Sequence, residues 1–306
     1  MKPQPSFIAT GYRYFLVVAE TGSVRAAARA LNVAASAISR QLGLLESQLG
    51  IALFDRSGRS LALSPAGNVL LRGLRGLAQA TEETLDHLGA LRGLTRGIVQ
   101  IATVESISVS VLPDILLDFA RSYPGIQVSV TVAGSDAVTE LVREHQADLG
   151  FTFNPTSLEG LSAAVTRDMS LGAIMSPGHP LARSKRLTFA DCLAYPIAWP
   201  SLGLSLRAAL NRLPAARDLR PAFECNSLRL MATLAREGNC IAFQTLIGIE
   251  QDLVAGSLVW IPLADKRLPV DRLMLVRRKG QQGRIAADAF ADAAEKHLAV
   301  NRIVRK

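Results

Sequence analysis

Residues 14–67 carry the pattern that most restricts the fold of this chain: two short amphipathic helices, a tight turn between them and a basic loop after them. Ser23 precedes the alanine-rich segment Val24–Leu31, and its hydroxyl can accept a hydrogen bond from an amide of the first helical turn. An Asn-Val pair then predicts the turn. A second helix is expected over Ala35–Leu49, where apolar residues recur at spacings of three and four.

The two faces of this second helix differ in polarity. Its inward face is expected to hold Ile38, Leu42, Leu45 and Leu49, and its outward face Ser36, Ser39, Arg40 and Gly43. A helix about 10 to 12 Å across can enter a major groove about 12 Å wide, and short polar side chains near its N-terminus allow a close approach. The pattern therefore predicts a DNA-reading helix-turn-helix followed by a basic wing.

A longer set of residues at fixed spacing runs through the same segment: Phe15, Ala19, Gly22, Ser23, Ala26, Ala27, Leu31, Ser39, Arg40, Gln41, Leu45, Glu46, Leu49, Gly50, Leu53, Phe54, Arg56, Pro65, Ala66 and Gly67. This set resembles the DNA-binding domain of the LysR-type transcriptional regulators. The resemblance implies a second helix in the major groove and an arginine-containing wing on the backbone and minor groove. The DNA-binding residues so implied are Ser23, Ala35, Ser36, Ser39, Arg40, Gln41, Arg56 and Arg59.

Two positions depart from the family pattern. Where relatives commonly have Ser or Thr and then Gln, this chain has Ala34 and Ala35. The usual helix cap and one base-reading amide are therefore missing, so the resemblance does not predict the target DNA sequence.

The net charge of +8 is unevenly distributed along the 306 residues. Lys and Arg number 10 against 6 Asp and Glu in residues 1–93, 15 against 16 in residues 94–269, and 9 against 4 in residues 270–306. A basic N-terminal part beside a near-neutral central part is typical of a chain in which one part faces phosphate. The basic run at residues 277–279 is more typical of a solvated strand end than of a second nucleic-acid surface.

One long helix is expected from Ala66 to about Leu91, with Pro65 in its first turn. Apolar or threonine residues recur along it at steps of four and three: Leu70, Leu74, Leu77, Thr81, Thr84, Leu88 and Leu91. So narrow a stripe favours pairing with another helix, the alternative being packing on its own domain. The linker helix of LysR-type relatives pairs in this way, which implies a homodimer through this helix and a homotetramer built from two kinds of dimer.

A strand and helix alternation begins after glycines at 89, 93 and 97. Strands are expected at 98–104, 127–133 and 148–153, with helices at 112–122 and 137–145 between them, which predicts a parallel sheet with right-handed crossovers. The alternation continues through 164–175, 196–199, 204–213, 228–237, 240–243, 258–263 and 270–277 to a closing helix at 283–298.

This second stretch resembles the effector-binding part of the same family, which is similar to periplasmic solute-binding proteins. The matching segments are LPDILLDFARSYPGIQVSV, ADLGF, PGHPLA with LTFADC after it, and GSLVWIPL. The implied fold class is an α/β effector domain of two Rossmann-like lobes, preceded by an all-α winged helix-turn-helix and a long linker helix. The expected domains are 1–65 (DNA binding), 66–93 (linker) and 94–306 (effector binding), with lobe one at about 94–166 plus 270–306 and lobe two at about 167–269.

Candidate effector-binding residues follow from this fold. In open α/β sheets a ligand binds beyond the carboxyl ends of the strands, where helix N-termini offer free amides. The residues expected there are Ser106, Ser108, Ser135, Thr152, Trp199, Ser201, Asn226, Ser227 and Phe243. A hydroxyl-rich cleft with two aromatic side chains suits a small organic anion or a polar aromatic compound. Each serine also has an ordinary competing role as a helix cap or turn residue.

Enzyme signatures are missing from the sequence. It has no G-x-S-x-G, H-E-x-x-H, Walker or G-x-G-x-x-G motif, and none of its four histidines is paired with a plausible nucleophile. Cys192, Cys225 and Cys240 have no C-x-x-C spacing and are expected to be buried thiols, with a redox-sensing thiol as the alternative. No enzymatic activity, metal or cofactor is therefore expected.

The sequence as a whole is interpreted as a one-component transcription factor. It is expected to bind double-stranded promoter DNA through residues 1–65 and a small-molecule effector between its two lobes, with RNA polymerase as a further partner. With no export signal and no apolar run of about 18 residues, a cytoplasmic location and no membrane contact are expected. The alternatives are an architectural DNA-binding protein without an effector and a solute-binding receptor.

Overall fold

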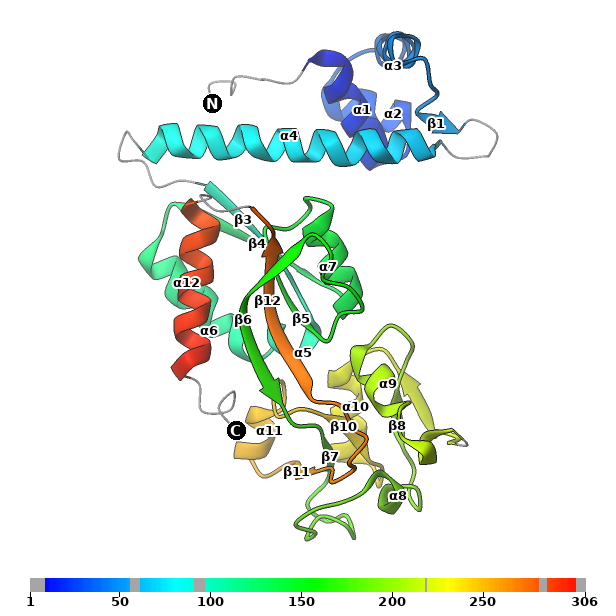
Figure 1. The fold of residues 1–306 in the computed structure, drawn as a ribbon, viewed down its shortest axis with the longest axis vertical. Helices are drawn as coiled ribbons and strands as arrows, with labels where there is room; N and C mark the ends of the chain where they lie inside the picture. Colours follow the sequence, from blue (N-terminus) through cyan, green and yellow to red (C-terminus); the bar gives the residue numbers. More distant parts are fainter. Residues whose placement is uncertain (1–8, 56–60, 91–96, 218, 281–284, 301–306) are drawn as a thin grey trace. The chain divides into compact units, whose positions relative to one another are not determined.

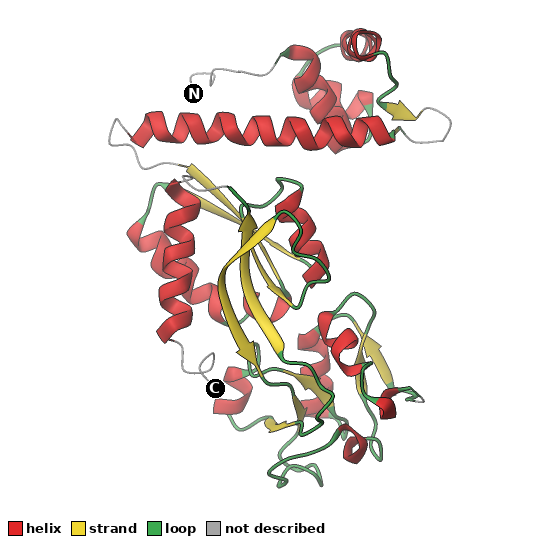
Figure 2. Cartoon of the chain, in the orientation of Figure 1, coloured by secondary structure: helices red, strands yellow, loops and turns green. Residues whose placement is uncertain are grey.

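The computed structural model describes residues 9–55, 61–90, 97–217, 219–280 and 285–300. The chain divides into two compact units, Met1–Leu88 and Gly89–Lys306 (Figure 1). The first unit is mainly helical, whereas the second combines sheets with helices (Figure 2). Among the residues described, no helix has the length and apolar character needed to cross a lipid bilayer.

The first unit is built from helices around one apolar core. Its elements are α1 (Thr10–Thr21), α2 (Val24–Leu31), α3 (Ala35–Leu49), β1 (Phe54–Asp55), β2 (Ala62–Leu63) and α4 (Pro65–Ala90). The core contains Phe15, Val18, Ala27, Ala28, Ile38, Leu42, Leu45, Leu53, Phe54, Leu71 and Leu74. The bounds predicted for α2 and α3 are confirmed, and β1 and β2 form an antiparallel hairpin after α3.

The ends of these helices follow from particular residues. The Ser23 hydroxyl accepts a hydrogen bond from the Ala26 amide at 3.4 Å, which confirms the predicted cap of α2. Asn32 ends α2 with φ at 54°, a left-handed conformation that asparagine tolerates better than most residues. Ala34 gives α3 no side-chain cap. The prediction that Leu49 faces inward is wrong: it is 45% exposed, because the core on this helix face stops at Leu45.

The stripe predicted along α4 is divided between two environments. Leu74 is buried in the core of the first unit and Leu70 packs partly against it. Leu77, one turn further along, is 48% exposed. The start of the stripe therefore packs on its own unit, and its outward part begins at Leu77. The side chains of Leu88 and Leu91, at the end of the predicted stripe, lie outside the described residues.

Lobe one of the second unit is centred on a five-stranded sheet in the order β4-β3-β5-β12-β6. Its strands are β3 (Gly97–Thr103), β4 (Ile126–Val132), β5 (Leu149–Phe153), β6 (Leu161–Met169) and β12 (Asp271–Arg278). β3 runs parallel to β4 and β5, as predicted, whereas β12 runs antiparallel to β5 and β6. The sheet is therefore mixed and not wholly parallel. The chain passes to lobe two after β6 and returns as β12, which pairs antiparallel with β6.

Helices cover both faces of this sheet. α6 (Val111–Ser122) and α12 (Ile285–Val300) pack on one face, and α7 (Ser135–Arg143) lies on the other (Figure 1). The rings of Phe119 on α6 and Phe290 on α12 meet edge to face, with centroids 5.1 Å apart. The short helix α5 (Glu105–Ser108) follows β3 at the carboxyl end of that strand.

Lobe two has short strands and a core of its own. Its strands are β7 (Gly172–Met175), β8 (Ala198–Pro200), β9 (Phe223–Cys225), β10 (Ala242–Gln244) and β11 (Val259–Pro262). Its helices are α8 (Phe189–Cys192), α9 (Ser205–Leu210), α10 (Leu228–Glu237), α11 (Glu250–Val254) and the 3₁₀ turn Pro214–Ala216. The one segment predicted over 164–175 contains two strands, because β6 ends at Met169 in one lobe and β7 begins at Gly172 in the other.

The basic run at residues 277–279 was predicted to be a solvated strand end, but its arginines bond to neighbouring helices. Arg278 is only 8% exposed, and its guanidinium donates to the carbonyls of Val142 and Ala147 at the end of α7. Arg277 forms an ion pair with Asp288 on α12, with the two charged atoms 2.8 Å apart. The run therefore ties two helices to β12.

Candidate DNA-binding surface and interlobe cavity

The outward face of α3 carries most of the side chains predicted to contact DNA. Ser36, Ser39 and Arg40 are exposed on the face opposite the buried residues, while Ala35 and Gln41 are half-buried at its edges. Ser23 is half-buried and caps α2. The two arginines predicted for the wing, Arg56 and Arg59, lie outside the described residues.

The base of the wing is fixed to α3 by one carboxylate. Oε1 of Glu46 accepts hydrogen bonds from the amides of Leu53 at 2.8 Å and Phe54 at 3.3 Å. These bonds set the start of β1 relative to the exposed face of α3. Glu46 belongs to the family-like pattern of the sequence, but its partners come from a later loop and cannot be predicted from helical spacing.

The other side of the wing is fixed to the start of α4. The Ser64 hydroxyl accepts from the Gly67 amide at 3.0 Å and donates to the Ala52 carbonyl at 2.7 Å. A side chain at Gly67 would place its Cβ 2.1 Å from the Leu53 carbonyl oxygen. Only glycine therefore lets the first turn of α4 approach the strand this closely.

The second unit encloses a cavity of about 340 Å³ between its lobes. Four of the predicted effector-binding residues line it: Ser106, Ser135, Asn226 and Ser227. Further polar groups in the lining are Glu105, Ser205, Gln244, Thr245 and Asp271, and apolar ones include Val132, Phe153, Leu171 and Leu206. The structure thus brings together residues from the carboxyl ends of strands in both lobes, as the fold class requires.

Three predicted polar residues do not line this cavity. The Ser108 hydroxyl donates to the Glu105 carbonyl at 2.7 Å within α5. Thr152 is fully buried, and its hydroxyl donates to the Ser135 carbonyl at 3.0 Å. Ser201 follows β8, where its amide bonds to the Cys225 carbonyl at 2.8 Å. In all three, the bonds recorded are to the backbone.

The two aromatic residues predicted for the cleft, Trp199 and Phe243, do not line the cavity either. Both are buried in the core of lobe two, where their ring centroids lie 5.5 and 5.2 Å from that of Phe189. They sit in the middle of the three-residue strands β8 and β10, whose side chains alternate between faces. The aromatic ring that lines the cavity is Phe153, at the end of β5.

A carboxylate from lobe one reaches the N-terminus of a helix in lobe two. The Ser227 hydroxyl donates to Oε1 of Glu105 at 2.7 Å, and the Leu228 amide donates to Oε2. Ser227 is also the N-cap of α10, accepting from the Leu230 amide at 3.1 Å. Free amides and the helix dipole favour a negative charge at this position. Glu105 supplies that charge and links the lobes.

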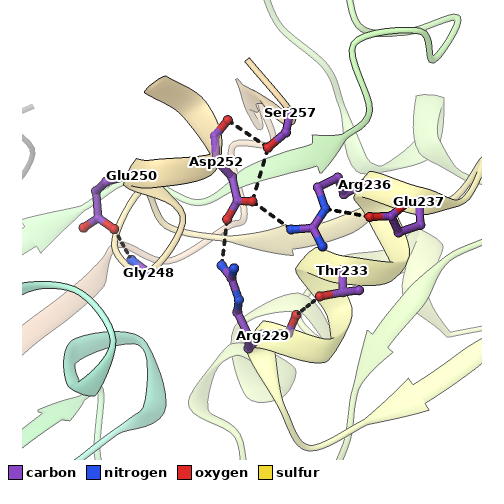
Figure 3. Close-up of polar contacts among 8 residues, drawn as sticks. All are labelled: Arg229, Thr233, Arg236, Glu237, Gly248, Glu250, Asp252 and Ser257. Atoms are coloured by element: carbon purple, nitrogen blue, oxygen red, sulfur yellow. Dashed lines mark hydrogen bonds and ion pairs between the residues drawn. The ribbon is translucent and has the colours of Figure 1, made fainter. Parts of the chain in front are cut away.

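A second link lies on the other side of α5. The Ser110 hydroxyl donates to the carboxylate of Glu250 on α11, and the Gly248 amide donates to the same carboxylate at 2.9 Å. Figure 3 shows Glu250 turned toward Gly248. The first residue of α11 therefore contacts lobe one.

α10 is held to α11 by a buried carboxylate between two arginines (Figure 3). Asp252 accepts hydrogen bonds from Arg229 at 2.7 Å and from Arg236 at 2.9 Å. Burial opposes ionisation of Asp252, but the hydrogen bonds from Arg236 and Arg229 outweigh it and hold the pKa of this carboxyl below its usual range. The helix whose N-terminus faces the cavity is thus fixed within lobe two.

Asp271 brings a second carboxyl group to the cavity wall. It is the first residue of β12, pairs in register with Met169 where β6 ends, and is 5% exposed. The Asn154 side-chain amide donates to its Oδ1 at 3.0 Å. Burial raises the pKa of Asp271 to about 7. Asp271 was not among the predicted site residues, although its place at the predicted return of the chain between the lobes was a signal.

Both units match models of one family. Residues 10–68 match the bacterial regulatory helix-turn-helix protein of the lysR family, and residues 92–299 match the LysR substrate binding domain. The chain belongs to the LysR family. It is a LysR-type transcriptional regulator with a helix-turn-helix domain and a two-lobed substrate-binding domain.

Similar proteins agree with this assignment. An uncharacterized HTH-type transcriptional regulator of Mycobacterium tuberculosis, Rv2282c, is 31% identical over 267 residues, which cover 83% of this chain and 85% of the relative. BbuR of Bordetella bronchiseptica, an HTH-type transcriptional regulator, is 27% identical over 87% of this chain and 82% of its own.

Solved structures share the fold at lower identity. A full-length OxyR variant from Pseudomonas aeruginosa superimposes with a TM-score of 0.71 at 14% identity and covers 99% of this chain and 98% of its own. CbnR in complex with its target DNA gives a TM-score of 0.62 at 22% identity and covers 94% of this chain and 98% of its own.

The three cysteines of this LysR-type regulator lie where a thiolate is disfavoured. Burial, with a smaller contribution from Asp191, raises the pKa of Cys192 to about 12, and burial also raises the pKa of Cys225 and of Cys240. Because the thiolate is the reactive form, these environments favour unreactive thiols over a redox sensor. Within the described residues, no group of His, Cys, Asp and Glu is arranged to hold a metal ion.

Proposed function

We propose that this LysR-type regulator binds double-stranded promoter DNA in the cytoplasm and that a small-molecule effector in the interlobe cavity alters that binding. It acts by binding and not by catalysis. The observation that carries the first part is the exposed polar face of α3, where Ser36, Ser39 and Arg40 lie opposite the buried apolar residues of the same helix. The structurally similar CbnR has been solved with its target DNA.

In this proposal, residues 1–65 form the DNA-binding domain. Ser36, Ser39, Arg40 and Gln41 read the major groove, with Ala35 and Ser23 at the edges of the contact. Arg56 and Arg59 contact the backbone and the minor groove from the wing.

Residues 66–93 pair two copies into a homodimer, and two kinds of dimer make a homotetramer. Pairing would begin at the outward residue Leu77, because the earlier stripe residues serve the core of their own unit. A dimer sets the spacing of two recognition helices on DNA. Contact with RNA polymerase is a further part of the proposal.

Residues 94–306 bind the effector. The cavity of about 340 Å³ lies within the size range of small-ligand sites and combines hydroxyl, amide and carboxyl groups with apolar walls. Since Glu105 and Ser227, which link the lobes, line this cavity, a ligand there can change the relation of the lobes. A coupling free energy of about 1 to 3 kcal/mol would suffice for regulation.

A matched pair of substitutions on α3 tests the DNA-binding part. Ser39→Glu introduces bulk and negative charge on the proposed groove-facing surface, whereas Ser47→Glu makes the same change at an exposed position near the far end of the helix. A duplex enriched from a random-sequence pool by the wild-type protein serves as the probe. We expect Ser39→Glu to abolish binding of that duplex and Ser47→Glu to retain most of it. Equal binding by both variants would overturn the placement of α3.

A further inference from the structure

The charges in the interlobe cavity are all of one sign. Its lining contains the carboxyl groups of Glu105 and Asp271, and none of the described residues that line it is a lysine, arginine or histidine. The remaining polar groups are neutral hydroxyls and amides. An organic anion entering this space could accept hydrogen bonds from these groups, but it would lie beside two carboxyl groups and no basic side chain of the lining.

One helix N-terminus at the cavity is already occupied by a carboxylate of the protein. The N-terminus of α10 is filled by the Glu105 carboxylate, which bonds to the Ser227 hydroxyl and the Leu228 amide. The N-terminus of α7 carries Asp136 in its first turn. At α10, an internal carboxylate thus supplies the negative charge that the helix dipole favours.

Asp271 has no cationic partner in the described part of the chain. Its one recorded hydrogen-bond donor is the neutral side-chain amide of Asn154, and the neighbouring Arg272 pairs with Asp168 at 2.8 Å. Burial without a counter-charge disfavours the ionised carboxyl, which is why the pKa of Asp271 is raised to about 7. A bound ammonium group would supply both the positive charge and hydrogen-bond donors.

We infer that the effector is a small organic ammonium compound whose positive group pairs with Asp271 and whose hydrocarbon part lies against Val132, Phe153, Leu171 and Leu206. This inference rests on the proposed function of the cavity as the effector site. The sequence predicted a small organic anion or a polar aromatic compound, and this inference replaces the anion with a ligand of opposite charge. The Ser106 hydroxyl and the Asn226 amide also line the cavity and can bond a second polar group of the ligand, and the Ser135 hydroxyl, which accepts from the Phe153 amide at 3.4 Å, can still donate.

The experiment compares ligands that differ only in their polar group. A library of about twenty hydrocarbon skeletons, each as a primary amine, an alcohol and a carboxylate, is screened against the full chain at pH 8 by thermal shift. Hits are titrated calorimetrically. We expect stabilisation by amines, with dissociation constants about tenfold or more below those of the matching alcohols and carboxylates.

Two variants locate the binding group. Asp271→Asn keeps the side-chain shape and should weaken binding of the best amine about tenfold or more. Asp118→Asn removes the same charge from the exposed surface of α6 and should leave it unchanged. The comparison of amine with alcohol on the wild-type protein gives a result even if Asp271→Asn does not fold.

The possible outcomes separate the inference from the proposed function. Preferential binding of amines that depends on Asp271 supports both. Preferential binding of carboxylates or alcohols, or amine binding that survives Asp271→Asn, overturns the ammonium inference and leaves an effector site in place. Absence of any hit in all three classes overturns the effector role of the cavity and favours an architectural DNA-binding protein.

Discussion

Glu105 accepts a hydrogen bond from Ser227 at 2.7 Å although the two residues are 122 positions apart and belong to different lobes. The same carboxylate accepts from the Leu228 amide, so one side chain both neutralises the start of α10 and links the lobes. The interlobe cavity lies directly beside this link. Glu105 and Ser227 therefore line the proposed ligand site and also hold the two lobes together. This shared role is the physical basis for coupling ligand binding to the arrangement of the lobes.

Glu105→Gln should loosen this link without removing its shape. A neutral amide accepts weaker hydrogen bonds than a carboxylate and loses the favourable interaction with the helix dipole, so we expect a loss of about 1 kcal/mol. Hydrogen exchange of the Leu228 amide, followed by mass spectrometry of peptides spanning the start of α10, should accelerate. Glu250→Gln serves as the control, because its bonds lie at Ser110 and Gly248. Unchanged exchange at Leu228 in Glu105→Gln would count against the link.

Asp252→Asn should destabilise the effector domain by about 2 to 3 kcal/mol. The substitution leaves Arg229 and Arg236 without the buried charge that accepts their hydrogen bonds (Figure 3). Denaturant unfolding monitored by tryptophan fluorescence measures the loss, since Trp199 and Trp260 both lie in lobe two. The control is Glu237→Gln, an exposed partner of Arg236 for which a change within about 0.5 kcal/mol is expected. Similar losses for both variants would contradict a special role for Asp252.

The local pattern of apolar and polar residues in the sequence was sufficient to predict much of the secondary structure. Helical periodicity located α2, α3 and α10 to their ends, and β-branched runs located β3 and β4 to within one residue. The short elements β9, α8 and α11 were missed, because three to five residues give too few repeats to establish a period.

Site residues could be predicted from the sequence only where the fold class alone fixes their place beside the cavity. Ser106 and Ser135 follow strands whose carboxyl ends meet, so they line the cavity as expected. Trp199 and Phe243 lie at the centres of three-residue strands, and packing decides which face of so short a strand turns toward the core. Glu105 was not predicted as a functional residue, because its partners Ser227 and Leu228 belong to the other lobe and the contact depends on the arrangement of the two lobes.

The stability of the effector domain should fall as the pH rises from about 4 to about 7. Asp271 has a pKa of about 7 in the folded protein against an ordinary value of 3.8, so in this window the folded state holds a proton that the unfolded state has released. The contribution is complete below about pH 4, is lost as the pH passes through 7, and has an upper bound of about 4 kcal/mol. Unfolding free energies of wild type and Asp271→Asn are compared at pH 5 and pH 8. The wild type should lose more stability between these two values, and parallel profiles would show that Asp271 titrates normally.

Arg40→Ala should reduce the salt dependence of DNA binding. Arg40 is exposed on α3, and each lost phosphate contact lowers the slope of log K against log salt by about one unit. Fluorescence anisotropy with an enriched duplex at several salt concentrations measures the slope. Arg121→Ala removes an exposed arginine from α6 and should leave it unchanged. An unchanged slope with relaxed preference at one base pair would instead identify Arg40 as a base contact, and no change in either would remove it from the interface.

Gly67→Ala and Gly73→Ala should have opposite effects although both lie in α4. At Gly67 a Cβ would come within 2.1 Å of the Leu53 carbonyl oxygen, so the backbone at the base of the wing must shift, at a cost of about 2 to 3 kcal/mol. At Gly73 nothing lies within 4 Å, and alanine should stabilise the helix by about 0.5 to 1 kcal/mol. Thermal unfolding measures both changes, and affinity for an enriched duplex should fall only for Gly67→Ala because the wing moves relative to α3. If Gly67→Ala matched Gly73→Ala in stability and affinity, the wing would not depend on this close contact.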